Sequence, residues 1–224
     1  MAQAISKYLR GKTCYACEDA ATSRDHVPPK LFFPEESDLG GAYGNLRRDL
    51  ITVYACEKHN NEASGDDAYF ACFVAVASTP NSRLARLHFE TKIKRALDKD
   101  PQVAQWFADA IWKNGRPVRQ FATVDTDRFD RCVSKIVKGL YYDITRRKIK
   151  SETITGIIYP NMFDSEGEQP AIFRTIDRGL KRHLWVRHRA GSPRIFTSEY
   201  FLDIAMPHRV AFRLKFYESF EVWA

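Results

Sequence analysis

The sequence has no long apolar run, no internal repeat and no low-complexity tract. Its longest uninterrupted apolar stretch, Phe70–Ala77, is far shorter than the roughly 20 residues that cross a bilayer. Only 5 cysteines occur in 224 residues, an odd number that does not suit a disulfide framework. The first residues lack the apolar segment of a secretory signal, so a cytoplasmic protein without a membrane partner is expected. These absences exclude membrane proteins, secreted disulfide-rich domains and coiled coils.

The composition is that of an ordinary globular protein, with 44% hydrophobic and 28% charged residues. Its 35 Lys and Arg outnumber its 28 Asp and Glu, which gives a formal net charge of +7. The excess is uneven, because residues 1–67 carry 8 basic and 11 acidic side chains and the rest carries 27 basic and 17 acidic. A nucleic-acid partner would explain a basic second part, and so would an ordinary solvated surface.

The first part of the chain is rich in turn formers and predicts a loop-rich unit with short strands. The β-branched run Leu50–Ala55 predicts a strand, and the apolar spacing over Asn60–Ala77 predicts a helix. The segment Ser78–Ser82 then breaks the pattern. We therefore expect two units, residues 1–78 and residues 79–224.

The second unit is expected to place helices before strands. Helices are predicted over Arg83–Lys99, Asp100–Lys113 and Thr126–Lys148, from apolar residues at helical spacing and from Asp100-Pro101 as a helix start. Strands are predicted over Thr153–Tyr159, Ala171–Ile176, His183–Arg189, Arg194–Ala205 and Arg209–Phe216. Helices followed by a mainly antiparallel sheet define an α+β fold.

Two short ligand pairs lie in the first unit. Cys14 and Cys17 form a C-x-x-C pair, and Cys56 and His59 form a C-x-x-H pair. Two such pairs supply the four tetrahedral ligands of a closed structural zinc site, and metal binding can replace a missing core in a loop-rich segment. The alternative, incidental small cysteines and a surface histidine, requires two pairs of the right spacing to arise by chance.

Basic residues recur at steps of three and four along the predicted helix Thr126–Lys148. On a helix they share one face, which suits the phosphates of a nucleic acid, although a solvated helix face is an equally good interpretation. Lys30, in a predicted loop, is a further candidate contact. The residues of the stripe are Arg128, Arg131, Lys135, Lys138 and Arg146.

The order CYAC, RDHVPPKLF and DLITVYACEKHNNEASGDDAYF resembles the HNH endonucleases, the ββα-metal or His-Me finger nucleases, over about residues 14–70. The resemblance implies an endonuclease that hydrolyses phosphodiester bonds, most readily those of double-stranded DNA. In that family two short strands and a helix hold one divalent cation beside a histidine. The zinc of such proteins is architectural, so two metals with different roles are expected.

Carried over by position, the resemblance makes His26 the general base that activates water. It makes Asp25 and Asn60 the holders of the catalytic cation, Mg²⁺ or Mn²⁺. The asparagine that orients the histidine in many relatives is either replaced by Asp49 or supplied by Asn45. Asp66 or Asp67 could join the cation site, but a solvated helix surface is the simpler interpretation of both.

Two other functions stay open. One is a non-catalytic, zinc-stabilised module that binds nucleic acid, and the other is a nuclease effector that cleaves RNA, since backbone contacts do not select the sugar. Cutting both strands with one site per chain would favour a homodimer.

Overall fold

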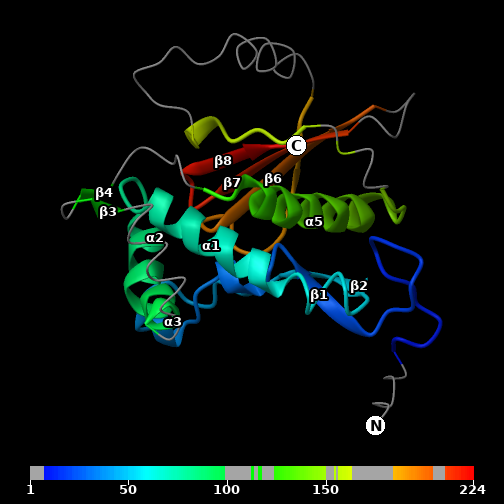
Figure 1. The fold of residues 1–224 in the computed structure, drawn as a ribbon, viewed down its shortest axis with the longest axis horizontal. Coiled ribbons are helices and arrows are strands. Elements are labelled where there is room, and N and C mark those ends of the chain that lie inside the picture. The colour runs from blue at the N-terminus through cyan, green and yellow to red at the C-terminus, as the bar shows by residue number, and fades with distance from the viewer. Residues whose placement is uncertain are drawn as a thin grey trace.

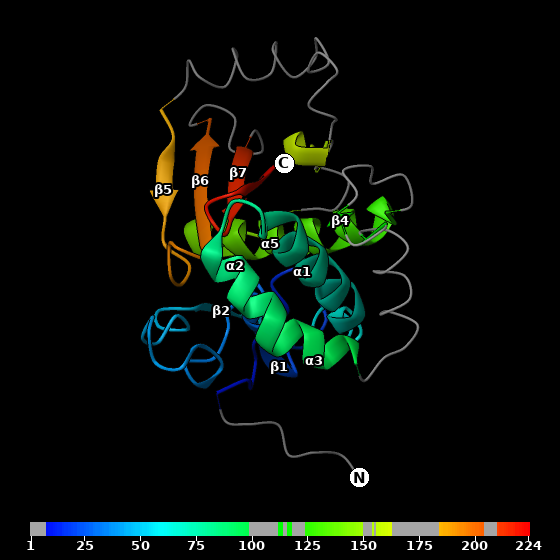
Figure 2. The same ribbon diagram turned by 90° about the vertical axis from the view of Figure 1, so that its left-hand side faces the viewer.

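The computed structural model describes residues 8–98, 112–113, 116–117, 124–149, 154, 156–162, 184–203 and 210–224. These residues form three layers (Figure 1), with helices α1 (Ser64–Ser78) and α5 (Thr126–Thr145) between a four-stranded sheet and a two-stranded hairpin. A turn of the view by 90° keeps the sheet on one side of the helices and the hairpin on the other (Figure 2). Helices combined with antiparallel strands confirm the predicted α+β class. None of the described helices has the length and apolar character needed to span a membrane.

The hairpin pairs β1 (Ser23–Val27) with β2 (Ile51–Ala55) in antiparallel register, and β2 confirms the strand predicted from its β-branched residues. One face of the hairpin packs against α5. Gly139 of α5 permits this approach, because a Cβ at that position would lie 2.5 Å from Cγ2 of Val27. The side chain of Val27 in the hairpin thus packs directly against the backbone of α5 at Gly139.

Helix α1 is apolar on nearly every side, as expected of a helix that is buried all round. The ring of Phe70 lies 4.9 Å from that of Phe129 on α5 and 5.7 Å from that of Phe216 in the sheet, measured between ring centres. Helix α5 begins after Asp125, whose side chain caps the backbone N–H of Arg128 at 3.2 Å. Aromatic packing of this kind joins the helical layer to the sheet.

The helix predicted over Arg83–Lys99 is present as a continuous helix that contains one π-helical turn. α2 (Arg83–His88) passes through a π-helical turn at Phe89–Ile93 into α3 (Lys94–Leu97). The side chain of Ser82 caps its start by accepting a hydrogen bond from the backbone N–H of Ala85.

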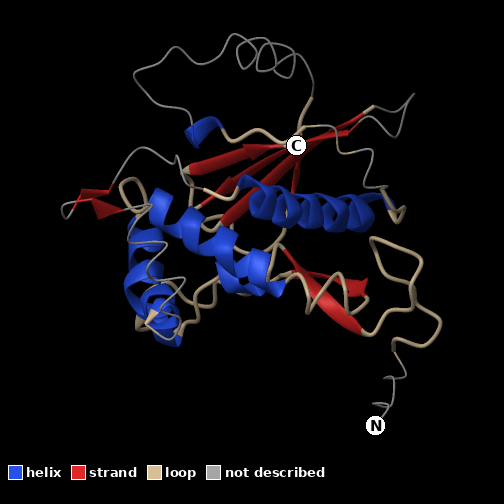
Figure 3. Cartoon of the chain, in the orientation of Figure 1, coloured by secondary structure: helices blue, strands red, loops and turns tan. Residues whose placement is uncertain are grey.

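The four strands of the sheet are antiparallel in the order β5-β6-β7-β8 and are coloured red in Figure 3. β6 and β7 confirm two predicted strands, β5 falls inside a third, and β8 was not predicted. The predicted strand Ala171–Ile176 lies outside the described residues, and of Thr153–Tyr159 only Ile158 is described in a bridge, with Trp223. The bounds are β5 Val186–His188, β6 Phe196–Leu202, β7 Val210–Phe216 and β8 Phe220–Trp223.

The end of the predicted helix Asp100–Lys113 is wrong. Residues Trp112–Lys113 form a short strand, β3, which pairs with β4 (Arg116–Pro117). The helix stop expected at Asn114-Gly115 lies outside the described residues, and this dipeptide favours hairpin turns as well as helix ends. The rest of that predicted helix lies outside the described residues.

Buried residues on both sides of Ser78 belong to one hydrophobic core. The helix before this position, α1, packs against α5 after it, and the hairpin packs against α5 as well. The division into residues 1–78 and 79–224 stays a prediction about the sequence, but the two parts bury their apolar surfaces together.

Candidate functional site

Four side chains near the N-terminal end converge into one cluster. Cys14 and Cys17 come from the turn before β1, and Cys56 and His59 come from the turn after β2. Their ligand atoms all lie within 4.8 Å of one another. The three sulfur atoms lie 3.6, 3.5 and 3.2 Å from Nδ1 of His59. The Sγ atoms of Cys17 and Cys56 are 3.7 Å apart.

These distances match a tetrahedron of metal ligands. With Zn–S bonds of about 2.3 Å and Zn–N bonds of about 2.0–2.1 Å, ligand atoms are about 3.8 Å apart for two sulfurs and about 3.6 Å apart for sulfur and nitrogen. The residues fit the group that their spacing predicts, so the cluster is compatible with a structural metal such as zinc. All four positions are filled by protein, as in sites whose metal stabilises the fold.

Backbone contacts hold the first cysteine turn in place. The N–H of Ala16 donates to Sγ of Cys14 at 3.4 Å, and the N–H of Tyr15 donates to the carbonyl of Tyr54 on β2 at 2.7 Å. These bonds orient one thiol and fix the turn against the hairpin.

A lysine beyond the end of α5 also holds this turn. Nζ of Lys148 lies 2.9 Å from Oγ1 of Thr13, 2.7 Å from the carbonyl oxygen of Cys17 and 3.0 Å from Oε2 of Glu18. The metal cluster is therefore connected to α5 as well as to the hairpin.

Asp25 lies in a buried triad with Lys135 and Asp67, from three different elements. Nζ of Lys135 is 3.0 Å from Oδ2 of Asp25 and 2.6 Å from Oδ2 of Asp67. The thiol of Cys132 donates to the other oxygen of Asp67 at 3.4 Å. Asp67 is only 4% exposed, so its interpretation as a solvated surface charge is wrong. We call these three charged residues the Lys135 triad.

The electrostatics of the triad follow from its burial. Desolvation raises the pKa of Asp25 and of Asp67, although the ammonium of Lys135 opposes both shifts. Burial also disfavours the charge of Lys135, but Asp67 and Asp25 outweigh it and raise the pKa of the ammonium. Two carboxylates share one buried cation, and this is where the structure positions Asp25.

His26 follows Asp25 on β1 but lies on the other face of the strand. Successive strand residues alternate, and here Asp25 and Val27 are buried whereas His26 is half-buried. Burial, then the charge of Lys30, lower the pKa of His26, so that its imidazole is neutral at pH 7. Asp25 partly opposes this shift.

Asn60 reaches the same strand from the turn that carries His59. Its Nδ2 donates to Oγ of Ser23 at 2.8 Å, and Ser23 shares its face of β1 with Asp25, two residues on. The structure thus brings Asn60 to the strand of Asp25, with His26 turned to the opposite face.

The two candidates for the orienting asparagine have other contacts. Oδ1 of Asn45 accepts the backbone N–H of Arg47 at 2.9 Å. Asp49 has a left-handed φ of 61°, and its carboxylate lies 3.8 Å from the guanidinium of Arg48. Neither contact involves His26, so the choice between the two stays a prediction.

The basic stripe of α5 faces acidic residues of α1. The guanidinium groups of Arg128 and Arg131 lie 2.9 and 2.6 Å from the carboxylate of Asp66. Arg128 also stacks over the ring of Tyr69 at 4.1 Å from its centre. These arginines hold two helices together, and the charge of Asp66 balances part of theirs.

The rest of the stripe is engaged in a similar way. Lys135 is buried in the triad, Lys138 is 8% exposed, and the guanidinium of Arg146 lies 3.1 Å from the carboxylate of Asp143. Lys30, predicted in a loop, is the first residue of a short 3-10 helix after β1, η1 (Lys30–Phe32), and is exposed. Helical spacing therefore grouped the residues of α5 correctly, while the acidic groups that they meet were not visible in the pattern.

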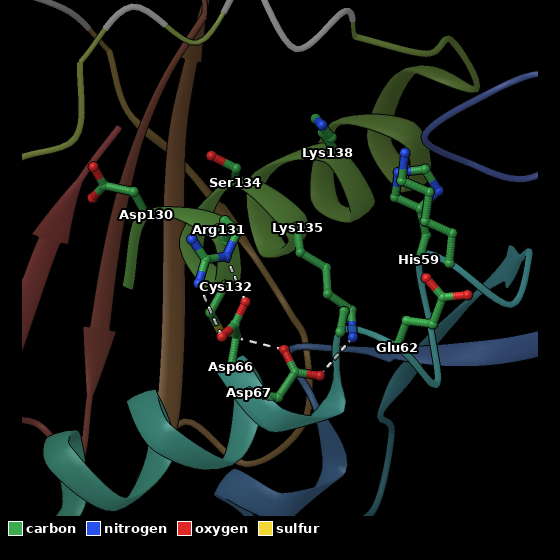
Figure 4. A pocket seen from close by; sticks show the side chains of 12 residues that line it. His59, Glu62, Asp66, Asp67, Asp130, Arg131, Cys132, Ser134, Lys135 and Lys138 are labelled. Atoms are coloured by element: carbon green, nitrogen blue, oxygen red, sulfur yellow. Dashed lines mark hydrogen bonds and ion pairs between the residues drawn. The ribbon is translucent and has the colours of Figure 1, made fainter. Parts of the chain in front are cut away.

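A cavity of about 500 Å³ lies between the turn after β2 that carries His59, the start of α1, and α5 (Figure 4). In this view Arg131 reaches Asp66 and Lys135 reaches Asp67 across it. Sequence reasoning missed the role of Asp67, although a second acid in the first turn of a helix beside a metal-binding turn is a usable signal. The lining residues are Lys58, His59, Glu62, Ala63, Asp66, Asp67, Asp130, Arg131, Cys132, Ser134, Lys135 and Lys138.

Comparisons of the chain with protein-family models, with curated proteins and with solved structures find no match. Function is therefore inferred from the geometry and chemistry of the site.

Proposed function

We propose that this chain is a metal-dependent nuclease of the HNH type, which hydrolyses phosphodiester bonds of DNA with His26 as general base. The observation that carries the proposal is the hydrogen bond from Asn60 to Ser23, because it joins the metal-binding turn to the strand of Asp25 and His26. Two paired strands, β1 and β2, followed by helix α1 are the parts expected of a ββα-metal unit, and they support the proposal. Zinc in the Cys₃His cluster holds these parts together.

The state of His26 suits proton abstraction. A half-buried imidazole whose pKa is lowered by burial and by Lys30 is neutral at pH 7 and accepts a proton from water. The water oxygen then bonds to phosphorus, the bond from phosphorus to the 3′-oxygen breaks, and the leaving oxygen takes a proton from solvent. Arg24 adds positive charge near His26, which favours an approaching phosphodiester, whereas the charge of Arg47 is paired with Glu35 at 2.7 Å.

The side chains proposed to hold the catalytic cation carry oxygen atoms of the kind that such a cation binds. The carboxylate of Asp25 and the amide oxygen of Asn60 are hard ligands of the kind that Mg²⁺ and Mn²⁺ prefer, and they would hold it on the inner face of β1. Such a cation would supply positive charge that stabilises the transition state of phosphoryl transfer. Because its ligands lie on the face of β1 opposite His26, the phosphodiester would have to lie at the edge of the strand to meet both groups. The ammonium of Lys135 already lies 3.0 Å from Asp25, so the cation would share this carboxylate with the lysine.

One observation favours a second candidate, a non-catalytic zinc-stabilised module that binds nucleic acid. In the Lys135 triad a protein ammonium already balances the charge of Asp25, and a buried carboxylate with such a partner has a purely structural explanation. The two candidates differ in whether any nucleic acid is cleaved.

Cleavage of supercoiled plasmid DNA, duplex and single-stranded oligonucleotides, and RNA in Mg²⁺ or Mn²⁺ tests the proposal. We expect the wild-type chain to cut DNA, and His26→Ala to lower the rate by about 100-fold or more, the usual loss for a general base. The matched control is His188→Ala, which removes another half-buried histidine, on β5 and paired with Asp143 at 3.1 Å. Zinc content and melting temperature should be unchanged in His26→Ala.

Normal cleavage by His26→Ala would overturn the assignment of the base. Absence of cleavage by the wild-type chain on every substrate, together with measurable binding, would replace the nuclease with the binding module. Cleavage of RNA alone would keep the mechanism and change the substrate.

A further inference from the structure

The outward face of the β1–β2 hairpin differs from the face that packs on α5. Cross-strand pairing places Arg24 opposite Tyr54 and His26 opposite Thr52, so these four side chains share one face. All four are exposed or half-buried, whereas Asp25 and its partner Val53 on the inner face are buried. We call the four residues together with Lys12 and Lys30 the hairpin face.

Two cations flank the aromatic ring at the centre of this face. Nζ of Lys12 lies 5.7 Å and the guanidinium carbon of Arg24 lies 5.6 Å from the centre of the Tyr54 ring. The backbone carbonyl of Lys12 accepts the N–H of Ala21, in the segment that leads into β1, at 2.9 Å. The ring of Tyr54 and the guanidinium of Arg24 therefore lie on the same face of the hairpin as His26.

The charges of the hairpin face are not balanced by nearby acids. Lys12, Arg24 and Lys30 are exposed, and within the described part of the chain no carboxylate lies at ion-pair distance from any of them. The polar contact of Arg24 is with the carbonyl of Thr52, at 3.4 Å. On α5, by contrast, Arg128, Arg131, Lys135 and Arg146 all meet carboxylates.

We propose that the hairpin face, and not the basic stripe of α5, receives the sugar-phosphate backbone of nucleic acid. Lys12 and Arg24 contact successive phosphates, and Tyr54 between them packs against the sugar or an unstacked base. This inference rests on the proposed function, because a phosphodiester bound on this face meets the imidazole of His26.

Binding without cleavage tests the inference separately from the nuclease activity. Fluorescence polarisation of a labelled 30-base-pair duplex is measured on the zinc-loaded chain, without Mg²⁺, Mn²⁺ or chelator. If two phosphate contacts are lost, Lys12→Ala with Arg24→Ala weakens binding about 30-fold at 0.15 M salt and lowers the slope of log affinity against log salt by about 1.8. Circular dichroism and zinc content confirm that the variant is folded.

The matched control removes the same charge from another surface. Arg83→Ala with Arg86→Ala changes two exposed arginines of α2, which lies apart from the hairpin in Figure 1. This variant is expected to bind within about twofold of wild type.

Three results would overturn the inference. They are unchanged binding by the Lys12 and Arg24 variant, an equal loss in both double variants, and equally tight binding of vesicles of anionic phospholipid through the same residues. Loss of binding in a chain that never cleaves would refute the nuclease and leave the binding face standing. Normal binding by the Lys12 and Arg24 double variant, together with loss of cleavage in His26→Ala, would refute the binding face and leave the nuclease standing.

Discussion

Replacing Lys135 by Met isolates the contribution of the buried ammonium. Met retains most of the stem of the lysine, so the packing of α5 against α1 changes little. The substitution removes the charge that lies 3.0 Å from Asp25 and 2.6 Å from Asp67, and both carboxylates are about 95% buried. Two like charges are then left in the interior without a counter-ion.

Removing one partner from a buried ion pair costs about 3–5 kcal/mol. Here two carboxylates lose the same ammonium, and uptake of a proton by one of them limits the cost, so we expect about 4 kcal/mol, close to a thousandfold shift in the folding equilibrium. The triple variant Lys135→Met, Asp25→Asn, Asp67→Asn removes all three charges. It should recover most of the loss, because buried ion pairs can often be replaced by neutral groups at little cost.

Urea unfolding at pH 7.5 with saturating zinc, followed by circular dichroism, measures these differences. The control is Arg131→Met on the same helix, which breaks an ion pair whose arginine is largely exposed and should change stability little. A Lys135→Met variant within about 1 kcal/mol of wild type would show that the triad is not the desolvated cluster described above.

Three further predictions follow from buried groups. Gly139→Ala should cost about 1–3 kcal/mol in urea unfolding, because its Cβ would lie 2.5 Å from a β1 valine, whereas Gly65→Ala, with 3.7 Å to its nearest neighbour, should cost nothing. Burial lowers the pKa of His88 to about 3, so the unfolded chain binds a proton that the folded chain rejects, and stability falls as pH drops below about 6.5. Between pH 6.5 and 4.5 wild type should lose about 2.3 kcal/mol more than His88→Asn, and equal losses would refute this. Cys56→Ser should abolish bound zinc in metal analysis and lower the melting temperature, whereas Cys72→Ser, outside the cluster, should retain the metal.

Local patterns predicted much of the fold. β2, α1, α5 and β7 follow from periodicity and β-branched residues, and the cluster of Cys14, Cys17, Cys56 and His59 follows from two short ligand spacings. Each of these signals depends on residues that are neighbours along the chain. The helix end predicted at Lys113 was wrong because Asn-Gly ends helices and also turns hairpins.

The interior of the site could not be predicted in this way. Helical spacing shows that Arg131 and Lys135 share a face of α5, but not that this face meets Asp66 and Asp67 of α1. The burial of Asp25 against Lys135 depends on the packing of three elements that are far apart in sequence. The pattern of α5 therefore could not show which of its basic residues are paired with acids, and it carried no information on the exposed Lys12 and Arg24 beside the hairpin.

The position of Lys148 has a consequence for how the molecule would respond to a metal ion in the Cys₃His cluster. One ammonium beyond α5 holds the cysteine turn through three oxygen atoms, those of Thr13, Cys17 and Glu18. Release of the ion would free this turn, and the lysine would lose its partners at the same moment. Loss of the metal would then make the chain more sensitive to proteolysis at the carboxyl end of α5. This position is remote in sequence from all four residues of the Cys₃His cluster.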